Sequence, residues 1–266
     1  MKIQDILLVS DIDGTLIDKN HQIPTRNREA ICRFMQKGGG FAIATGRSWE
    51  SVEKCLDGLK VNRPCVLANG GVVFDMQTRR ALSCQPLPAE AIEYTRRFLK
   101  AFPEAGVEVF TPSDVLMLRE NQVTRDHMRH ERLQYQTAKI EEITEPWCKV
   151  LIASTEQPAL MEFTRSFPHP GVRFVASSDR YWEMLPEGAD KGTGIARLAE
   201  VCGVPMSAVA AIGDYYNDVE MLQTAGIPAV PANAPEEIQK LAKWITCSCE
   251  EGAVAEFIEI LERMYG

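Results

Sequence analysis

The stretch ILLVSDIDGT, residues 6–15, decides the fold of this chain. Its opening run is apolar and contains branched side chains, which favours a buried β-strand. Asp11, Asp13 and Gly14 follow this run directly. Side chains two residues apart in an extended chain point the same way, so we expect Asp11 and Asp13 to address one spot. Gly14 then lets the chain turn away beside a bound group.

The residues after this stretch alternate between short apolar runs and helical patterns. We expect a helix at 25–37, a strand at 41–45, a helix at 49–59 and a strand at 64–68. Strand and helix in regular alternation are typical of an α/β fold built on a doubly wound parallel sheet. In such open sheets, ligands bind at the carboxyl ends of the strands, where Asp11 lies.

The alternation stops after residue 83 and resumes near residue 187. Pro86 and Pro88 mark the first boundary, and the residues between mix strands and helices without simple alternation. The strands expected in this segment are 107–110, 115–118, 149–154, 172–177 and 181–185. Afterwards we expect a helix at 191–202, a strand at 208–213, a helix at 217–224 and a last helix after Glu251. We therefore predict a core of residues 1–83 and 187–266, with residues 84–186 inserted as an α+β cap domain.

The composition excludes several classes of protein. The chain has 266 residues, a net charge of -8 and a pI near 5.2, which argues against nucleic acid as the main partner. No apolar run is long enough for a membrane span, so we expect no membrane partner. The eight cysteines lack paired metal spacing. Since no secretion signal precedes them, we expect reduced thiols and a cytoplasmic protein.

Three further motifs fall at expected strand ends or helix starts. Thr45 and Gly46 follow the second strand, where a hydroxyl and backbone N–H groups can bind an anion. A simple helix N-cap explains the run Ala44-Thr45-Gly46-Arg47-Ser48 equally well. Lys191 precedes a helix, and a solvated surface lysine is its plainer interpretation. The run IGDYYND (212–218) places Asp214, Asn217 and Asp218 after a strand, although an acidic helix start would look the same.

The motifs carry more information together than singly. All of them fall on one edge of the same expected sheet. Two unit charges 4 Å apart repel by about 4 kcal/mol at an effective dielectric near 20, so four aspartates brought together require a cation. Oxygen ligands with room for water and phosphate favour Mg²⁺. An EF-hand calcium loop does not fit Asp11 and its successors, because the glycine is fourth and the twelfth residue is Gln22.

These motifs resemble a known family. In order, DIDGTL, ATGR, DKGTG and GDYYND look like the four motifs of the haloacid dehalogenase superfamily, and the large insertion resembles that of the Cof-type hydrolases. The likeness extends over essentially the whole chain. One departure is at Val230-Pro231: family members commonly carry a Met-Gly pair near Asn233-Ala234, whereas this chain has Ala229-Val230-Pro231-Ala232. Pro231 lacks a backbone donor and puts the local loop shape in doubt.

The resemblance implies a Mg²⁺-dependent phosphatase that acts on a small phosphorylated metabolite, such as a sugar phosphate, through an aspartyl-phosphate intermediate. Asp11 is then the nucleophile and Asp13 the general acid and base. The implied metal site comprises Asp11, Asp13 through its backbone carbonyl, Asp214 and Asp218. The implied substrate-binding residues are Thr45, Gly46, Lys191 and Asn217.

Two other functions remain open on the sequence alone. A phosphomutase would share this architecture but return the phosphoryl group to a substrate. A non-catalytic protein that binds phosphorylated metabolites would keep the fold, although a pure binder needs no Asp13. Within the cap, Arg119, Arg125, His127 and His130 are candidates to face the leaving group, but we favour exposed positions on a helix for the two histidines.

Overall fold

A five-stranded parallel sheet, here called the core sheet, contains the strand expected at the start of the chain. The computed structural model describes residues 1–266. The core sheet has the order β14-β13-β12-β1-β2. Its strands are β1 (Leu7–Ser10), β2 (Gly40–Ile43), β12 (Val209–Ile212), β13 (Ile227–Pro231) and β14 (Trp244–Thr246).

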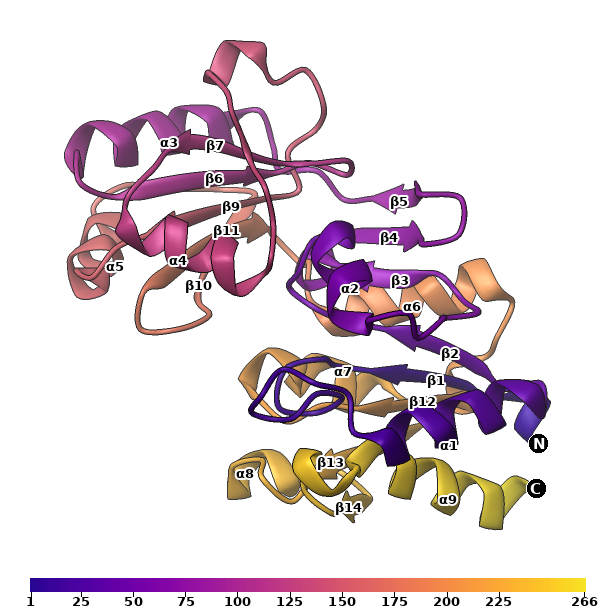
Figure 1. Ribbon diagram of the computed structural model, residues 1–266. Helices are drawn as coiled ribbons and strands as arrows, with labels where there is room; N and C mark the ends of the chain where they lie inside the picture. The colour runs from indigo at the N-terminus through magenta and orange to yellow at the C-terminus, as the bar shows by residue number, and fades with distance from the viewer.

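Helices cover both faces of the core sheet (Figure 1). One face packs against α1 (Thr25–Gln36) and α9 (Ala253–Tyr265), and the other against α6 (Lys191–Cys202) and α7 (Val219–Thr224). Leu8 of β1 belongs to the cluster with α1 and α9, whereas Leu7 and Val9 belong to the cluster with α6 and α7. Alternate residues of a strand point to opposite faces, so an unbroken apolar run is what a sheet covered on both sides requires.

A small antiparallel sheet extends from the edge of the core sheet. It comprises β3 (Cys65–Leu67), β4 (Val72–Asp75) and β5 (Arg80–Cys84). A parallel bridge between Ala44 and Val66 joins it to the end of β2. Helix α2 (Trp49–Leu56) connects β2 to β3. The hairpin of β4 and β5 leads the chain out of the core and towards the second large sheet.

The second large sheet, here called the cap sheet, has six strands in the order β10-β11-β9-β6-β7-β8. It lies to the upper left of the core sheet in Figure 1. The strands are β6 (Gly106–Phe110), β7 (Val115–Arg119), β8 (Gln136–Thr137), β9 (Lys149–Ala153), β10 (Val172–Ala176) and β11 (Tyr181–Pro186). The pairs are antiparallel except β7 with β8. All six lie within residues 84–186, which supports the predicted division into core and cap; its boundaries stay a prediction.

The two faces of the cap sheet differ in character. Helices α3 (Glu90–Ala101) and α5 (Gln157–Arg165) pack on one face with an aromatic and aliphatic cluster that includes Val107 and Val109. Glu108 lies between these two valines and is fully buried. The period of two therefore turns Glu108 to the opposite face. Lys149 and Glu183 are buried charged residues of neighbouring strands in the same sheet.

The remaining elements are short. They are the helix α4 (Gln122–His130), the helix α8 (Glu236–Gln239) and the 3-10 turns at Ile3–Asp5, Ala68–Gly70, Ile140–Glu142, Met206–Ala208, Tyr216–Asp218 and Cys249–Glu251. None of the helices combines the length and the apolar character needed to cross a membrane. Pro231, which the sequence left in doubt, is the last residue of β13 and lies opposite Thr246 of β14.

Candidate active site

Three neighbouring strands of the core sheet end at the same level. Ser10 of β1 lies opposite Ile212 of β12 and Ile43 of β2. The backbone N–H of Asp11 donates to the carbonyl of Ile212 at 2.9 Å, so the pairing continues one residue past the strand. Because the strands are parallel, the loops that carry Asp11, Thr45 and Asp214 all start at this edge. The topology thus brings together motifs that lie up to about 200 residues apart.

Asp11, Asp214 and Asp218 form a buried cluster of carboxylates. One oxygen of each lies within 4.8 Å of the others. Burial raises the pKa of Asp11 well above its ordinary value, and the Asp218 and Asp214 carboxylates add to this while Lys191 opposes it. Burial also raises the pKa of Asp214 to about 6, with Asp218 as the next contributor. The raised pKa values show that the negative charges of these carboxylates are not fully compensated. Close oxygen ligands with uncompensated charge fit a hard divalent cation.

Lys191 contacts this cluster and is fully buried, so its interpretation as a solvated surface lysine was wrong. Its Nζ donates to Asp11 Oδ1 and to Asp218 Oδ1, both at 2.6 Å. Burial by itself lowers the pKa of Lys191, but the two carboxylates outweigh burial and raise the pKa above its ordinary value. Asp190 places the lysine by capping α6, because its Oδ1 accepts from the backbone N–H of Thr193 at 2.7 Å. The motif DKGTG therefore starts a helix and also supplies a buried cation.

Both carboxylate oxygens of Asp218 have partners within the protein. Oδ1 accepts from Lys191, and Oδ2 accepts from the backbone N–H groups of Asp214 and Tyr215 at 3.0 and 3.2 Å. Its side chain is completely buried. We conclude that Asp218 fixes the loop around Asp214 and holds Lys191, which leaves less of its carboxylate free for a metal than in Asp11 and Asp214.

Gly14 is required by the close approach of Asp214. Gly14 has φ +77°, and a Cβ there would lie 2.4 Å from Asp214 Oδ2. Thr15 Oγ1 donates to Asp214 Oδ1 at 2.9 Å and orients the carboxylate. The motif DIDGTL thus packs directly against the motif GDYYND, through the backbone of Gly14 and the hydrogen bond of Thr15.

Asp13 is held by an arginine to which the sequence gave no role. Arg47 donates from Nε to Asp13 Oδ2 at 2.8 Å and from Nη2 to Asp13 Oδ1 at 2.7 Å. Its Nη1 donates to Ser51 Oγ at 2.8 Å and lies 3.8 Å from Glu131 Oε1 of the cap. The Arg47 side chain is only 7% exposed. The only sequence signal for this role was an arginine directly after Thr45-Gly46, in a loop already singled out.

The cap contributes a series of buried, paired charges that leads to Arg47 at this edge of the core sheet. Glu108 Oε2 lies 2.8 Å from His127 Nδ1, and His127 Nε2 lies 3.6 Å from Glu131 Oε1. Burial lowers the pKa of His127, but Glu108 and Glu131 outweigh it and raise the pKa to about 10. The preference for an exposed His127 was therefore wrong, because one face of α4 packs against the cap sheet. Arg119 and Arg125 bond within the cap, to backbone carbonyls and to Glu120 respectively.

Two further contacts fasten the cap to the core. Lys149 Nζ donates to the carbonyl of Gly46 at 2.9 Å and lies 3.3 Å from Glu183 Oε1. Asn69 Nδ2 of the core donates to Glu183 Oε2 at 2.8 Å. The charged face of the cap sheet therefore contacts the loop after β2 and the turn after β3.

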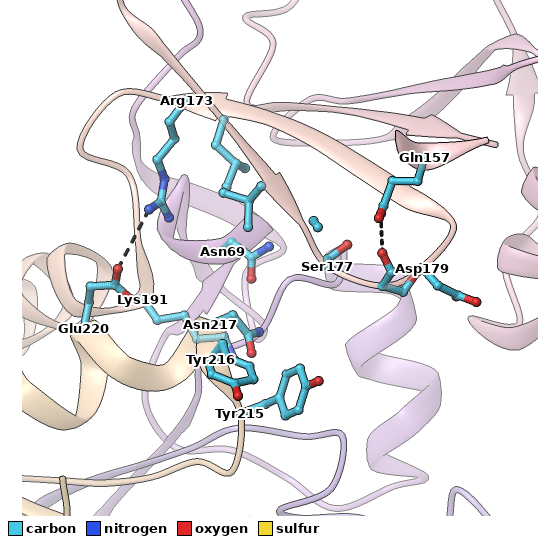
Figure 2. Close-up of a pocket in the computed structure, with 14 residues that line it drawn as sticks. Asn69, Gln157, Arg173, Ser177, Asp179, Lys191, Tyr215, Tyr216, Asn217 and Glu220 are labelled. Atoms are coloured by element: carbon cyan, nitrogen blue, oxygen red, sulfur yellow. Dashed lines mark hydrogen bonds and ion pairs between the residues drawn. The ribbon is translucent and has the colours of Figure 1, made fainter. Parts of the chain in front are cut away.

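A cavity of about 450 Å³ lies between core and cap at this edge. Among the residues singled out in the sequence, its lining includes Asp11, Asp13, Thr45, Gly46, Asp214, Asn217, His127 and His130. A second cavity of about 570 Å³ adjoins it and shares Asn69, Ser177, Ser178, Tyr215 and Asn217 with it. Figure 2 shows this second cavity, with Lys191 and Asn217 on the core side and Arg173 reaching Glu220 from the cap.

Comparison with known proteins shows to which family the chain belongs. A family model described as haloacid dehalogenase-like hydrolase matches residues 8–258. The 5-amino-6-(5-phospho-D-ribitylamino)uracil phosphatase YwtE of Bacillus subtilis is 29% identical, over 94% of this chain and 96% of that protein. An HMP-PP phosphatase of Yersinia enterocolitica is 26% identical, over 95% of this chain and 94% of that protein. A solved haloacid dehalogenase-like hydrolase from Bacteroides thetaiotaomicron superposes with a TM-score of 0.86 at 25% identity, covering 96% of this chain and 99% of that one.

Removal of the buried lysine tests the electrostatics of the cluster. Lys191→Met leaves Asp11 and Asp218 without their cation, so we expect the free energy of unfolding to fall by about 3 kcal/mol or more. The measurement is urea denaturation in the presence of a chelator. Lys19→Met is the matched control, because Lys19 pairs with Glu250 at the surface and its loss changes stability by about 1 kcal/mol at most. Equal effects of the two substitutions would contradict the role of Lys191.

The raised pKa of Asp214 predicts a pH dependence of stability. The folded protein binds this proton more tightly than the unfolded chain, because the pKa rises from 3.8 to about 6 on folding. The stabilisation is therefore complete below about pH 4 and is lost as the pH rises through about 6. In chelator, the unfolding free energy of the wild type is expected to fall by about 3 kcal/mol more across this window than that of Asp214→Asn. Parallel curves for the two proteins would show that Asp214 carries no such shift.

Proposed function

We propose that this chain, which belongs to the haloacid dehalogenase-like hydrolases, is a phosphatase that hydrolyses a phosphate monoester of a small metabolite through an aspartyl phosphate on Asp11. The observation that carries the proposal is the juxtaposition of Asp11 with the cation of Lys191 and with Asp214. Relatives named as phosphatases, aligned over nearly the whole chain, support the reaction class. Their names give different substrates, so the resemblance alone leaves the metabolite open.

Asp11 is placed to act as the nucleophile. Lys191 fixes the Asp11 carboxylate from below, so that its other oxygen can approach phosphorus without a large loss of rotamer freedom. In the first step a bond forms between that oxygen and phosphorus while the ester oxygen departs. A negatively charged carboxylate approaches a phosphate dianion only where cations offset the repulsion. Lys191 supplies one such charge beside the reacting oxygen.

The metal site that we propose comprises the carboxylates of Asp11 and Asp214 and the backbone carbonyl of Asp13. Asp218 supports it by holding the loop, and Asn217 lies on the cavity wall beside it. Oxygen ligands and few carboxylates favour Mg²⁺ over Ca²⁺. When bound, Mg²⁺ supplies positive charge that neutralises the carboxylates and the phosphoryl oxygens.

Asp13 is placed to move the protons. In the first step it donates a proton to the departing ester oxygen, and in the second it accepts a proton from the water that attacks phosphorus and releases Asp11. Arg47 holds both oxygens of Asp13 and so fixes the carboxylate in the cavity. Thr45 and Gly46 also line the cavity and are proposed to bind phosphoryl oxygens.

Substitution of the nucleophile tests the reaction itself. Asp11→Asn is expected to lower Mg²⁺-dependent phosphate release from 4-nitrophenyl phosphate by about 10³-fold or more, because the amide is a poor nucleophile and no covalent intermediate forms. The control is Asp114→Asn, an exposed cap aspartate, which should keep wild-type activity. A chelator should abolish turnover and added Mg²⁺ should restore it. Undiminished release from Asp11→Asn would rule the proposal out.

The leaving group tests Asp13 and Arg47. An alkyl phosphate needs a proton on its departing oxygen, whereas 4-nitrophenolate departs without one. For an alkyl phosphate, Asp13→Asn is expected to lower kcat/KM by about 10²- to 10⁴-fold, and for 4-nitrophenyl phosphate by much less. Arg47→Lys should show the same pattern more weakly, because lysine cannot hold both oxygens. Arg79→Lys, at an exposed pair with Glu53, is the control. Equal losses for both substrates would argue against an acid role.

A further inference from the structure

Two free cysteines meet where the chain leaves the core for the cap. Cys84 is the last residue of β5, and Cys148 directly precedes β9. Their Sγ atoms lie 3.0 Å apart, although 64 residues separate them in the sequence. This is the only hydrogen bond between two sulfur atoms among the eight cysteines of the chain. A disulfide joins two sulfurs at about 2.05 Å, so a small movement brings this pair to bonding distance.

Each of the two cysteines is held by a different part of the molecule. Cys84 pairs with Val72 of β4, in the small antiparallel sheet that extends from the core sheet. The backbone N–H of Cys148 donates to the carbonyl of Phe110, in β6 of the cap sheet, at 2.7 Å. A bond between the two sulfurs would therefore tie the core side of the junction to the cap.

The surroundings favour Cys84 as the thiol that reacts first. Cys84 is half-buried, whereas Cys148 is fully buried. The hydrogen bond from the Cys148 thiol lowers the pKa of Cys84; burial opposes this effect, and the Arg197 guanidinium adds to it. The same hydrogen bond and burial raise the pKa of Cys148. Because the thiolate is the reactive form, Cys84 is suited to attack an oxidant and Cys148 to attack the product.

Neither metal binding nor the proposed reaction accounts for the pair. The two cysteines belong to no group of three or more side chains that could hold an ion, and a structural zinc site takes four ligands. Neither cysteine lines the cavity that contains Asp11. The reaction that remains open to two adjacent thiols is their oxidation to a disulfide.

We propose that Cys84 and Cys148 form a redox site at which hydrogen peroxide converts the two thiols into a disulfide between core and cap. The Cys84 thiolate attacks one peroxide oxygen, the O–O bond breaks, and Cys84 becomes a sulfenic acid. The Cys148 sulfur then gives up its proton and attacks the Cys84 sulfur, the S–O bond breaks, and water departs. The two sulfurs together lose two electrons, and one peroxide is reduced to two molecules of water.

The disulfide is expected to restrain the cap in its docked position. Lys149 follows Cys148 directly and donates to the carbonyl of Gly46, in the loop that lines the cavity. Because the cavity lies between core and cap, a cap that cannot move away slows the entry and release of ligands. This consequence for turnover rests on the proposed function, whereas the formation of the disulfide does not.

The first experiment maps the disulfide in the intact protein after treatment with hydrogen peroxide and alkylation of the remaining thiols. Trypsin releases residues 81–96 and 140–149 as peptides with one cysteine each, and we expect these two peptides to be joined until dithiothreitol separates them. Cys148→Ser should instead leave a sulfenic acid on Cys84, which dimedone labels. Cys32→Ser, at an exposed cysteine, is the matched control and should keep the cross-link. If peroxide oxidises Cys32 while peptides 81–96 and 140–149 stay separate, the redox site is wrong.

The second experiment measures the turnover of 4-nitrophenyl phosphate before and after oxidation. In the cross-linked wild type, kcat is expected to fall by about fivefold or more, and dithiothreitol should restore it. Cys84→Ala, treated in the same way, should keep its activity. An unchanged kcat in fully cross-linked protein would overturn the restraint on the cap. A protein that shows no turnover even before oxidation would contradict the proposed function and leave the mapped disulfide standing.

Discussion

The buried contact between Lys191 and the carboxylates of Asp11 and Asp218 is the interaction on which the rest of the site depends. It joins the start of α6 to the loops after β1 and β12 with two contacts of 2.6 Å. A charged lysine is costly to bury without partners. Lys191 is tolerated because its carboxylate partners are close and are themselves fixed by other contacts. Asp218 meets that condition, since its second oxygen caps two backbone N–H groups. The geometry around Asp11 is therefore fixed before any ligand binds.

The same principle operates where the cap meets the core. Arg47 and Lys149 are buried cations that each contact groups on both sides of the boundary. The cap sheet offers Lys149 an acidic partner because the period of two places Glu183 on the face opposite its apolar cluster, while Glu131, directly after α4, faces Arg47. Charge pairing thus contributes to aligning the cap over this edge of the core sheet. This arrangement links the position of Arg47, and through it Asp13, to the docking of the cap.

Local patterns in the sequence were sufficient for most of the fold and for part of the site. The buried strand before Asp11 and the helix from Lys191 appear as expected, because apolar runs and capping signals are local properties. The burial of His127 was missed, since helical periodicity shows that a helix has a face but does not name the neighbour that covers it. Arg47 and Asp13 are 34 residues apart, on the loops after β2 and β1, and no local pattern encodes such a contact.

Charge balance explains why the proposed site would take a divalent cation together with a substrate dianion. Asp11, Asp214 and Asp218 bring three carboxylates against the single charge of Lys191, and the raised pKa of Asp11 and of Asp214 reflects this excess. Protons relieve the excess of negative charge at low pH, but a proton on Asp11 would remove the proposed nucleophile. A divalent cation relieves it while leaving Asp11 ionised, and it also offsets the charge of an incoming phosphoryl group. In the proposed mechanism, metal binding and nucleophile activation are thus the same electrostatic requirement, because the single charge of Lys191 neutralises only part of the negative charge of the three carboxylates.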